Sequence, residues 1–233
     1  MRRIIIITQR DPFFVNAFLQ EFNKFNLPFQ IIDLPNFNKG FFWGIKRAKD
    51  LYGLLGVMKL SLIALKGIFT SKLHNCTEST KVSSIEEIKD FVNTLDDASI
   101  ILSLSAPCRI PVEEYDFKGK FVNLHCGKLP DYAGMMPIFW QILNNENKIT
   151  ITLHDVAKDI DSGRILLEKE MNISNTLFKT SVAAKKYSAK IFFDWIEDKE
   201  NSFNYIKEPN SLILRKFPEK KDINKFKKIY RLI

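Results

Sequence analysis

The sequence predicts an α/β fold, in which a mostly parallel β-sheet is flanked by helices on both faces. Residues 3–8 are a short, continuous run rich in β-branched residues, which is typical of a strand buried inside a parallel sheet. Phe14, Phe18 and Phe22 then recur at helical spacing, and residues 29–34 form a second apolar run. A strand, a helix and a strand in close succession make a βαβ unit, whose two strands lie parallel.

Start signals mark two of the predicted helices. Asp11 stands at the cap position and Pro12 at the first helical position of a helix that extends to about residue 26. Ser84 and Glu87 have the spacing of a capping box, which opens a helix that ends near residue 95.

The later elements alternate in the same way, and no internal repeat or linker interrupts them. Strands are predicted at 98–104, 121–125, 149–156 and 164–171, and helices at 137–145 and 175–197. We therefore expect one domain over residues 1–200, with a short basic extension over residues 201–233 that packs on it.

Composition narrows the class of protein. The chain has 233 residues, of which 45% are hydrophobic, and this excludes a disordered chain. Three cysteines without paired spacing argue against a disulfide framework and a four-cysteine zinc site, and they favour a reducing compartment such as the cytoplasm. No run reaches the roughly 18 apolar residues of a membrane span, and the N-terminal apolar run is too short for a signal peptide.

The formal net charge of +8 is concentrated at the C-terminus. From Lys207 onward there are nine basic residues and three acidic ones, so the rest of the chain is nearly neutral. We interpret this tail as a solvated terminal segment of the domain in preference to an RNA-binding site, which makes nucleic acid an unexpected partner. An anionic membrane surface or an acidic partner is the alternative.

Residues 41–70 form one or two amphipathic helices in this interpretation. Apolar residues recur at helical spacing among lysines, at Leu51, Leu54, Leu55, Met58, Leu62 and Leu65. Core packing or a subunit interface is the favoured interpretation, and a helix on a membrane surface is the alternative. A homodimer is left open.

Two polar residues stand out near the end of the strand at 121–125. Because side chains alternate along a strand, Asn123 and His125 face the same side and Leu124 the other. Open α/β sheets bind their ligands at the carboxyl ends of parallel strands. An amide donor beside an imidazole can stabilise an oxyanion.

A loop between two later strands carries acidic residues, among them Asp155, Asp159 and Asp161. The loop lacks the oxygen ligands and the terminal glutamate of a calcium loop, and we expect no metal site. Asp161 is followed by Ser162 and Gly163, so a turn presents its carboxylate, where it can orient an imidazole and raise its pKa.

Taken in order, these motifs resemble the formyltransferase family that uses N10-formyltetrahydrofolate. They are the run 121–138, which holds Asn-x-His and Leu-Pro, then the Thr-x-His strand at 150–154, and then the Ile-Asp-Ser-Gly loop at 160–163. The family includes methionyl-tRNA, glycinamide ribonucleotide and nucleotide-sugar formyltransferases. The resemblance is strong over about residues 97–172 and implies a single Rossmann-like formyltransferase domain.

By this resemblance, Asn123, His125 and Asp161 are the catalytic residues, with His125 hydrogen-bonded to Asp161 and favoured as imidazolium, and Thr152 and His154 support them. The implied donor site for N10-formyltetrahydrofolate consists of Ala106, Cys108, Arg109, Ile110, Gly127, Lys128, Leu129, Pro130, Val156 and Asp159. Arg10, Met135 and Met136 are the candidate acceptor-binding residues.

Departures from the family pattern guide the choice of acceptor. Ala133 stands where the family usually has an arginine, and the first strand does not lead into the glycine-rich turn of glycinamide ribonucleotide enzymes. The stretch after residue 197 is too short for the tRNA-gripping domain of methionyl-tRNA enzymes. We therefore expect a nucleotide-linked amino sugar as acceptor. The alternatives are a formyltetrahydrofolate hydrolase, another amine formyltransferase, or a non-catalytic membrane-peripheral protein of this fold.

Overall fold

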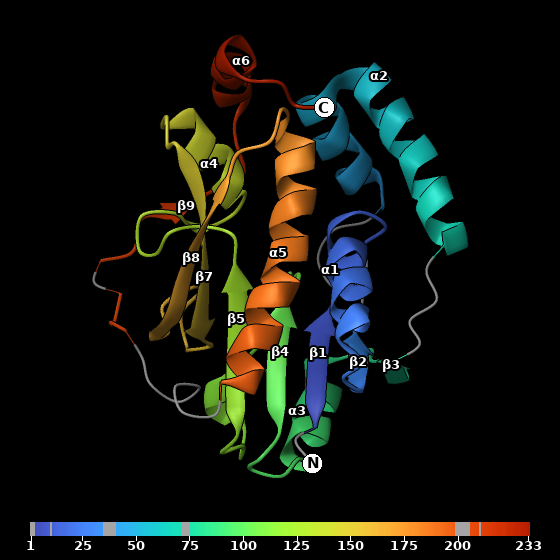
Figure 1. The fold of residues 1–233 in the computed structure, drawn as a ribbon, viewed down its shortest axis with the longest axis vertical. Helices are drawn as coiled ribbons and strands as arrows, with labels where there is room; N and C mark the ends of the chain where they lie inside the picture. The colour runs from blue at the N-terminus through green and yellow to red at the C-terminus, as the bar shows by residue number, and fades with distance from the viewer. Residues whose placement is uncertain (1–2, 10, 35–40, 71–74, 199–205, 210) are drawn as a thin grey trace.

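The computed structural model describes residues 3–9, 11–34, 41–70, 75–198, 206–209 and 211–233. Among these residues, seven strands form one sheet in the order β3-β2-β1-β4-β5-β7-β8 (Figure 1). The strands are β1 (Ile4–Thr8), β2 (Phe29–Asp33), β3 (Cys76–Lys81), β4 (Ile100–Leu104), β5 (Lys120–His125), β7 (Lys148–Asp155) and β8 (Ile165–Asn172).

The sheet is mostly parallel, as predicted. β1 lies between β2 and β4, and Ile6 is in register with Ile31 on one side and Leu102 on the other. β7 runs antiparallel to β5, and β8 antiparallel to β7. This arrangement places β7 directly beside the strand that carries Asn123 and His125.

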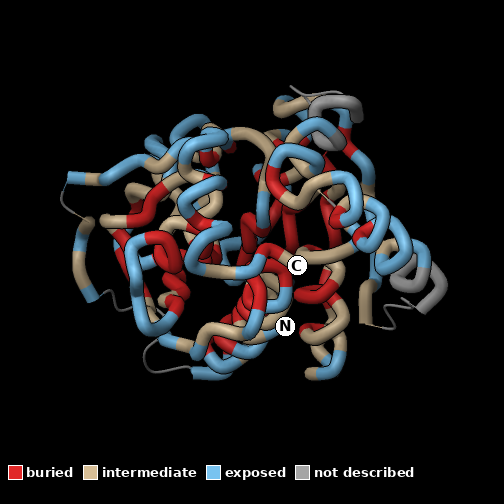
Figure 2. Tube along the Cα trace, turned by 90° about the horizontal axis from the view of Figure 1, so that it is seen from above, coloured by how far each residue is buried: buried red, intermediate tan, exposed pale blue. Residues whose placement is uncertain are grey.

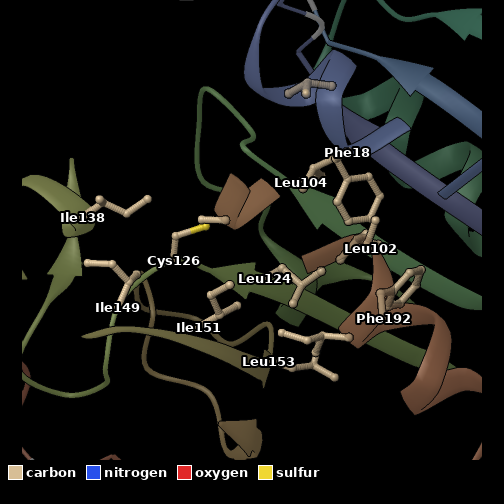
Figure 3. Close-up of a cluster of buried hydrophobic side chains, with 14 of the residues drawn as sticks. Phe18, Leu102, Leu104, Leu124, Cys126, Ile138, Ile149, Ile151, Leu153 and Phe192 are labelled. Atoms are coloured by element: carbon tan, nitrogen blue, oxygen red, sulfur yellow. The ribbon is translucent and has the colours of Figure 1, made fainter. Parts of the chain in front are cut away.

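Each face of the sheet packs against its own set of helices. Ile4 and Ile6 of β1 belong to the apolar cluster of α1 (Phe14–Phe22), α4 (Pro137–Leu143) and α5 (Leu177–Glu197). Ile5 and Ile7 face the other way, toward α3 (Ile85–Asn93). Figure 3 shows part of the first cluster, in which Phe18 of α1 lies among apolar side chains of the sheet. Burial on both faces explains why β1 is apolar at every position.

The predicted helix starts are confirmed, with one shift. The Asp11 carboxylate accepts hydrogen bonds from the backbone N–H groups of Phe13, Phe14 and Val15 at 2.6–2.9 Å, although α1 begins at Phe14. A 3-10 turn, η1 (Asn23–Phe25), continues α1 toward residue 26. Ser84 Oγ accepts from the Glu87 N–H at the start of α3.

The helix over residues 41–70 is α2 (Phe41–Thr70), and it breaks at Gly53, whose φ of 73° is left-handed. Of the six apolar positions expected to share one face, Leu51 is buried, whereas Leu54, Leu55, Met58, Leu62 and Leu65 are exposed. Of these six positions, core packing describes Leu51, and a subunit interface for the others stays a prediction. Exposed residues dominate α2 in Figure 2, where it lies at the right-hand edge. None of the described helices is both long and apolar enough to cross a membrane.

Four elements lie outside the strands and helices that the sequence predicts. β3 is a polar edge strand that pairs with β2. Near the C-terminus, β9 (Leu214–Arg215) pairs with β6 (Ala133–Gly134), and α6 (Lys220–Ile229) buries Phe226 against Phe139 with ring centroids 4.4 Å apart. The division of the chain at residue 200 stays a prediction.

Candidate active site

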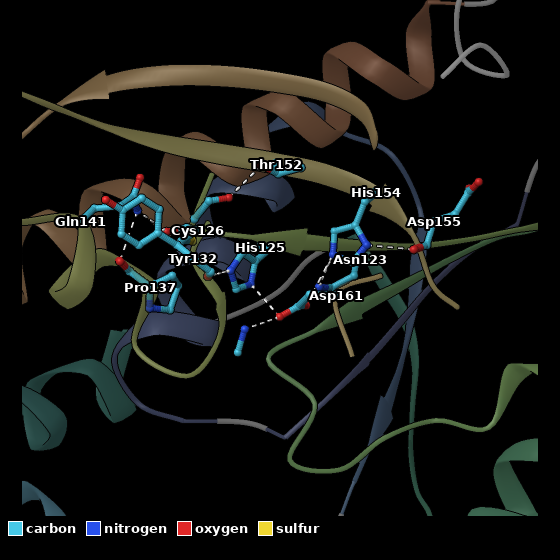
Figure 4. Close-up of polar contacts among 12 residues, drawn as sticks. Asn123, His125, Cys126, Tyr132, Pro137, Gln141, Thr152, His154, Asp155 and Asp161 are labelled. Carbon is cyan, nitrogen blue, oxygen red and sulfur yellow. Dashed lines mark hydrogen bonds and ion pairs between the residues drawn. The ribbon is translucent and has the colours of Figure 1, made fainter. Parts of the chain in front are cut away.

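The sequence-predicted catalytic residues meet between β5, β7 and the loop that joins β7 to β8 (Figure 4). Asn123 and His125 lie on β5, and Asn123 is in register with His154 of β7. Asp161 lies on the loop and reaches both imidazoles, at 3.5 Å from His125 and 3.6 Å from His154. The structure thus brings the three residues into one cluster, with His154 as a fourth member.

His154 holds the amide of Asn123. Nδ1 of His154 lies 2.8 Å from the carbonyl oxygen of Asp155, which can only accept, so Nδ1 carries the proton. In the tautomer with its proton on Nδ1, Nε2 is an acceptor, and the Nδ2–H of Asn123 donates to it at 3.0 Å. One N–H of the Asn123 amide is thereby fixed, and the second is left for a ligand.

His125 is buried between two acceptors. Its Nε2 lies 2.6 Å from the carbonyl oxygen of Tyr132, and its Nδ1 lies 3.5 Å from Oδ2 of Asp161. Burial lowers the pKa of His125 below its usual 6.5, against the opposing effects of Asp161 and the Tyr132 carbonyl. Asp161 acts to favour the imidazolium, as expected, but burial outweighs it. The separation of 3.5 Å is longer than the expected hydrogen bond.

Asp161 is held as a carboxylate in a left-handed backbone conformation, with a φ of 56°. Burial acts to raise its pKa, but His125, His154 and the Gly134 N–H, which donates to Oδ2 at 2.7 Å, lower it to about 2. A buried carboxylate with several donors stays ionised at neutral pH. A backbone conformation of this kind often marks a functional position.

Gly163 lets this loop turn back against β7. A Cβ built on Gly163 would lie 1.7 Å from the carbonyl oxygen of Asp155, so any side chain displaces the loop. Asp155 is also the residue whose carbonyl accepts from His154. The Asp-Ser-Gly pattern therefore has a steric reason, since the glycine allows the close approach that places Asp161.

The C-terminal strand β9 braces the segment that contacts His125 and Asp161. The Ile213 N–H donates to the Pro130 carbonyl at 3.0 Å, and the Met135 N–H to the Arg215 carbonyl at 2.9 Å. Arg215 also places its guanidinium 5.6 Å from the centre of the Tyr132 ring. Tyr132 and Gly134, which lie between these bonds, supply the carbonyl and N–H described above, so the tail helps to shape the site.

A cleft of about 570 Å³ adjoins the catalytic loop. Its wall combines aromatic and charged side chains, namely Val112, Tyr115, Phe117, Lys118, Gly119, Lys120, Phe121, Asp155, Val156, Ala157, Ser162, Gly163, Arg164, Glu208 and Pro209. The hydroxyl of Tyr115 is buried and has no hydrogen-bond partner among the described residues. Burial raises the pKa of Tyr115 to about 12, so the phenol is neutral and keeps its proton.

The residues expected to bind the donor fall into two groups. Ala106, Cys108, Ile110 and Val156 belong to the apolar cluster that also contains Tyr115, Phe117 and Phe121 from the cleft wall. Within this cluster burial raises the pKa of the Cys108 thiol. Of the expected residues, Val156 lines the cleft itself.

The other residues expected to bind the formyl donor lie outside this apolar cluster. Arg109 pairs with Glu113 and donates to the Lys158 carbonyl, which ties its loop to the catalytic loop. Leu129 is fully buried in a small cluster with Ala133 and Ile165, beside Pro130. Gly127 is buried and accepts a hydrogen bond from Thr152, whereas Lys128 and Asp159 are exposed. Their part in donor binding stays a prediction.

The expected acceptor-binding residues are described in part. Arg10 lies outside the described residues. Met135 is exposed, and Met136 has a left-handed φ of 55° at the N-terminus of α4. Both lie directly after Gly134 in the sequence. Their part in acceptor binding stays a prediction.

Sequence reasoning missed two kinds of contributor. Tyr132 and Gly134 act through backbone groups, which leave no residue-type signal. Tyr115 lies in a turn after η2 (Val112–Glu114), and its burial depends on strands far away in the sequence. His154 was not missed, because it was expected, with Thr152 on the same face of β7, to support the catalytic residues.

Comparison with known proteins finds similarity over part of the chain. Residues 113–190 match the family model described as formyl transferase. The methionyl-tRNA formyltransferase of Flavobacterium psychrophilum is 43% identical over 54 residues, which are 23% of this chain and 17% of that protein. The GDP-perosamine N-formyltransferase of Brucella melitensis is 29% identical over 106 residues, 45% of this chain and 40% of that protein. The matched segments thus span less than half of these relatives.

A solved structure extends the likeness to nearly the whole chain. It is a sugar 3N-formyl transferase in the presence of dTDP and 5-N-formyl-THF, with a TM-score of 0.58 and 23% identity, and it covers 94% of this chain and 72% of its own. At this identity the likeness shows the fold. Residues 113–190 therefore match the formyl transferase family model, within a chain whose fold is similar to that of a sugar N-formyltransferase.

Proposed function

We propose that the protein is an N-formyltransferase that moves a formyl group from N10-formyltetrahydrofolate to the amine of a nucleotide-linked amino sugar. The observation that carries the proposal is the cluster of Asn123, His125 and Asp161 beside a cleft with aromatic walls. The family match over residues 113–190, which includes all three residues, supports it.

The charge states of His125 and Asp161 suit the attack of an amine on a formyl carbon. The new C–N bond forms as the carbonyl π electrons move to oxygen, and the amine nitrogen must then lose a proton. His125 is neutral in the resting state and takes up this proton, and the ionised Asp161 stabilises the imidazolium that results. Collapse of the oxyanion breaks the bond to N10, which recovers a proton from the imidazolium.

Asn123 supplies the hydrogen bond to the developing oxyanion. Its amide is fixed by His154, so the second N–H is preorganised and needs no reorientation during the reaction. The site is largely buried, since His125 and Asp161 are each less than a tenth exposed in their side chains. Low solvent access strengthens such a hydrogen bond.

The cleft fits the donor chemically. The formyl donor carries a flat, polar heterocycle, which suits a wall built from Tyr115, Phe117 and Phe121. The buried Tyr115 hydroxyl retains a proton and has no partner among the described residues, so it can donate to a ring nitrogen or oxygen. Ser162 and Gly163, which also line the cleft, directly follow Asp161 and link the donor site to the reacting groups.

The acceptor class rests on the relatives. One curated relative is named for GDP-perosamine, and the solved sugar 3N-formyl transferase was obtained with dTDP. An amine on a nucleotide-linked sugar is the acceptor that these names share. The experiment below is designed to identify the sugar and its nucleotide.

The test uses the purified full chain with N10-formyltetrahydrofolate and a panel of dTDP-, UDP-, GDP- and CMP-linked amino sugars. Mass spectrometry of the sugar should show the gain of one formyl group with at least one member of the panel. Release of formate with every sugar left unmodified would contradict the proposal and indicate a hydrolase. Absence of any folate turnover would contradict formyl transfer as a whole.

A further inference from the structure

The second segment of α2, after the break at Gly53, exposes a row of large apolar side chains. We call this row the α2 stripe, and it consists of Leu54, Leu55, Met58, Leu62 and Leu65. Their exposed fractions run from 55% to 75%. Contiguous apolar surface of this kind marks an interaction site in a folded protein.

The stripe points away from the body of the protein. At about 100° per residue, its five positions occupy a sector roughly 100° wide on the helix. Gly56 and Leu60, which are buried, lie on the opposite side, as does Ile63, which is 42% exposed. The segment therefore packs on the protein through one face and presents a second apolar face outward, as Figure 1 shows for its place at the edge of the fold.

Positive charge borders the stripe. Lys59 is exposed and lies at the edge of the apolar sector. Residues 51–70 contain two lysines and no acidic residue. The first segment adds exposed Lys46 and Lys49, together with one exposed carboxylate, Asp50.

The basic tail lies at the same end of the molecule as the break in α2 (Figure 1). A Cβ built on Gly56 would lie 3.8 Å from Cγ2 of Ile233, the last residue, and the Arg47 guanidinium lies 4.3 Å from the centre of the Phe217 ring. The exposed lysines of α6 follow from this tail, at 220, 221, 225, 227 and 228. The last residue of the tail therefore packs against the buried side of the second segment of α2.

We propose that the α2 stripe and its surrounding lysines bind an anionic lipid surface, with the helix lying in the plane of the headgroups. An outward apolar face bordered by lysines is the pattern of an interfacial helix, in which the lysine heads reach the headgroups. A second copy that paired through its own α2 stripe would offer no counter-charge, because residues 51–70 lack acidic residues and pairing would bring lysines together. This surface is separate from the proposed catalytic site, so the two proposals stand or fall independently.

The test is co-sedimentation of the full chain with vesicles of phosphatidylcholine, with and without phosphatidylglycerol. We expect binding to the phosphatidylglycerol vesicles at low salt, and weaker binding as salt rises. Replacing Leu55, Met58 and Leu62 together by glutamine should weaken partitioning by at least about tenfold. Lys59→Glu should weaken it by about fivefold or more.

Matched controls distinguish lipid binding through the α2 stripe from nonspecific lipid binding by other exposed residues. Ile206→Gln with Ile213→Gln removes exposed apolar side chains elsewhere, and Lys169→Glu reverses an exposed charge on β8. Both controls should bind vesicles like the unaltered chain. Circular dichroism should show the same melting for all variants, since every position is exposed.

Failure of the full chain to bind phosphatidylglycerol vesicles at low salt would overturn the proposal. Equal binding by the triple glutamine variant would overturn it too. Sedimentation velocity adds a third outcome, because a dimer that the triple variant converts to monomer, without lipid binding, would assign the stripe to a second copy.

Discussion

Nδ1 of His125 lies 3.5 Å from Oδ2 of Asp161, and the pKa of each group is lowered from its usual value. Burial holds His125 neutral, while its neighbours hold Asp161 ionised. A base that is neutral beside a fixed negative charge is ready to accept a proton, because the product is an ion pair in a site of low dielectric constant. This relationship underlies the predictions that follow.

The activity should fall on the acid side of a pKa that lies below 6.5. His125 must be neutral to accept the amine proton, and its pKa is lowered, so kcat/KM should be constant above pH 6.5 and decline below it. The measurement is kcat/KM for the formyl donor across pH. A rate that falls as the pH rises through 6.5 would instead require the imidazolium in the resting enzyme.

Stability should change with pH in the same direction. The unfolded chain binds a proton at His125 as the pH falls through 6.5, and the folded chain resists it, so the free energy of unfolding decreases below that pH. Asp161 adds a loss at lower pH, between 3.8 and about 2, where the unfolded carboxyl protonates first. Urea unfolding of the protein and of His125→Gln should show a shallower pH dependence for the variant.

Asn123 and His154 should act as one unit. Asn123→Ala should lower kcat by about 10² or more, as loss of a single oxyanion donor does. His154→Leu removes the acceptor at 3.0 Å and should lower kcat with little effect on KM, and the double variant should be no worse than Asn123→Ala. His154→Gln, which offers an acceptor oxygen, should recover part of the rate. Additive losses in the double variant would show that His154 acts by another route.

Gly163→Ala should impair both folding and activity. The added Cβ would lie 1.7 Å from the Asp155 carbonyl oxygen, so the loop must shift, at a cost of about 1–3 kcal/mol or more. The shift should also displace Asp161 and lower kcat. Ser162→Ala is the control on the same loop, since it removes a hydroxyl that donates to Asp159 and leaves the turn intact. Equal melting temperatures for Gly163→Ala and the unaltered chain would contradict the steric account.

Tyr115→Phe should weaken binding of the formyl donor without destabilising the protein. The hydroxyl is buried without a partner among the described residues, so its removal should leave the melting temperature unchanged or raise it. Loss of a donated hydrogen bond should raise KM for the donor by about three- to tenfold, with kcat nearly constant. Tyr230→Phe is a matched control, because its hydroxyl is equally buried and unpartnered among the described residues but lies on the α6 side, outside the cleft wall. An unchanged KM in Tyr115→Phe would remove this residue from the donor site.

Much of the fold could be predicted because local patterns and burial agree. The run of β-branched residues in β1 is buried on both faces, and Asp11 caps the helix that follows. β3 could not be predicted, since an edge strand needs no apolar alternation and its partner β2 supplies the pairing. The exposure of the α2 leucines could not be predicted for a different reason. Helical spacing of leucines predicts an apolar face and does not say whether that face is covered.

The sequence was enough to predict which side chains form the site, but not how they are arranged or charged. The two-residue period of β5 placed Asn123 and His125 on one side, and the turn after Asp161 suggested a presented carboxylate. The sequence could not show that burial would outweigh Asp161 in setting the pKa of His125, because that balance depends on the whole packed site. It could not show the Tyr132 carbonyl either, since every residue type supplies one.

The most direct test of the central claim compares the unaltered chain with Asp161→Asn in transfer of a labelled formyl group from N10-formyltetrahydrofolate to the sugar amine. Asparagine keeps the shape and removes the charge that stabilises the His125 imidazolium. The account predicts that the rate falls by about 10²- to 10⁴-fold while affinity for the donor is retained. Full activity in Asp161→Asn would contradict the account, because a neutral residue would then serve in place of the carboxylate.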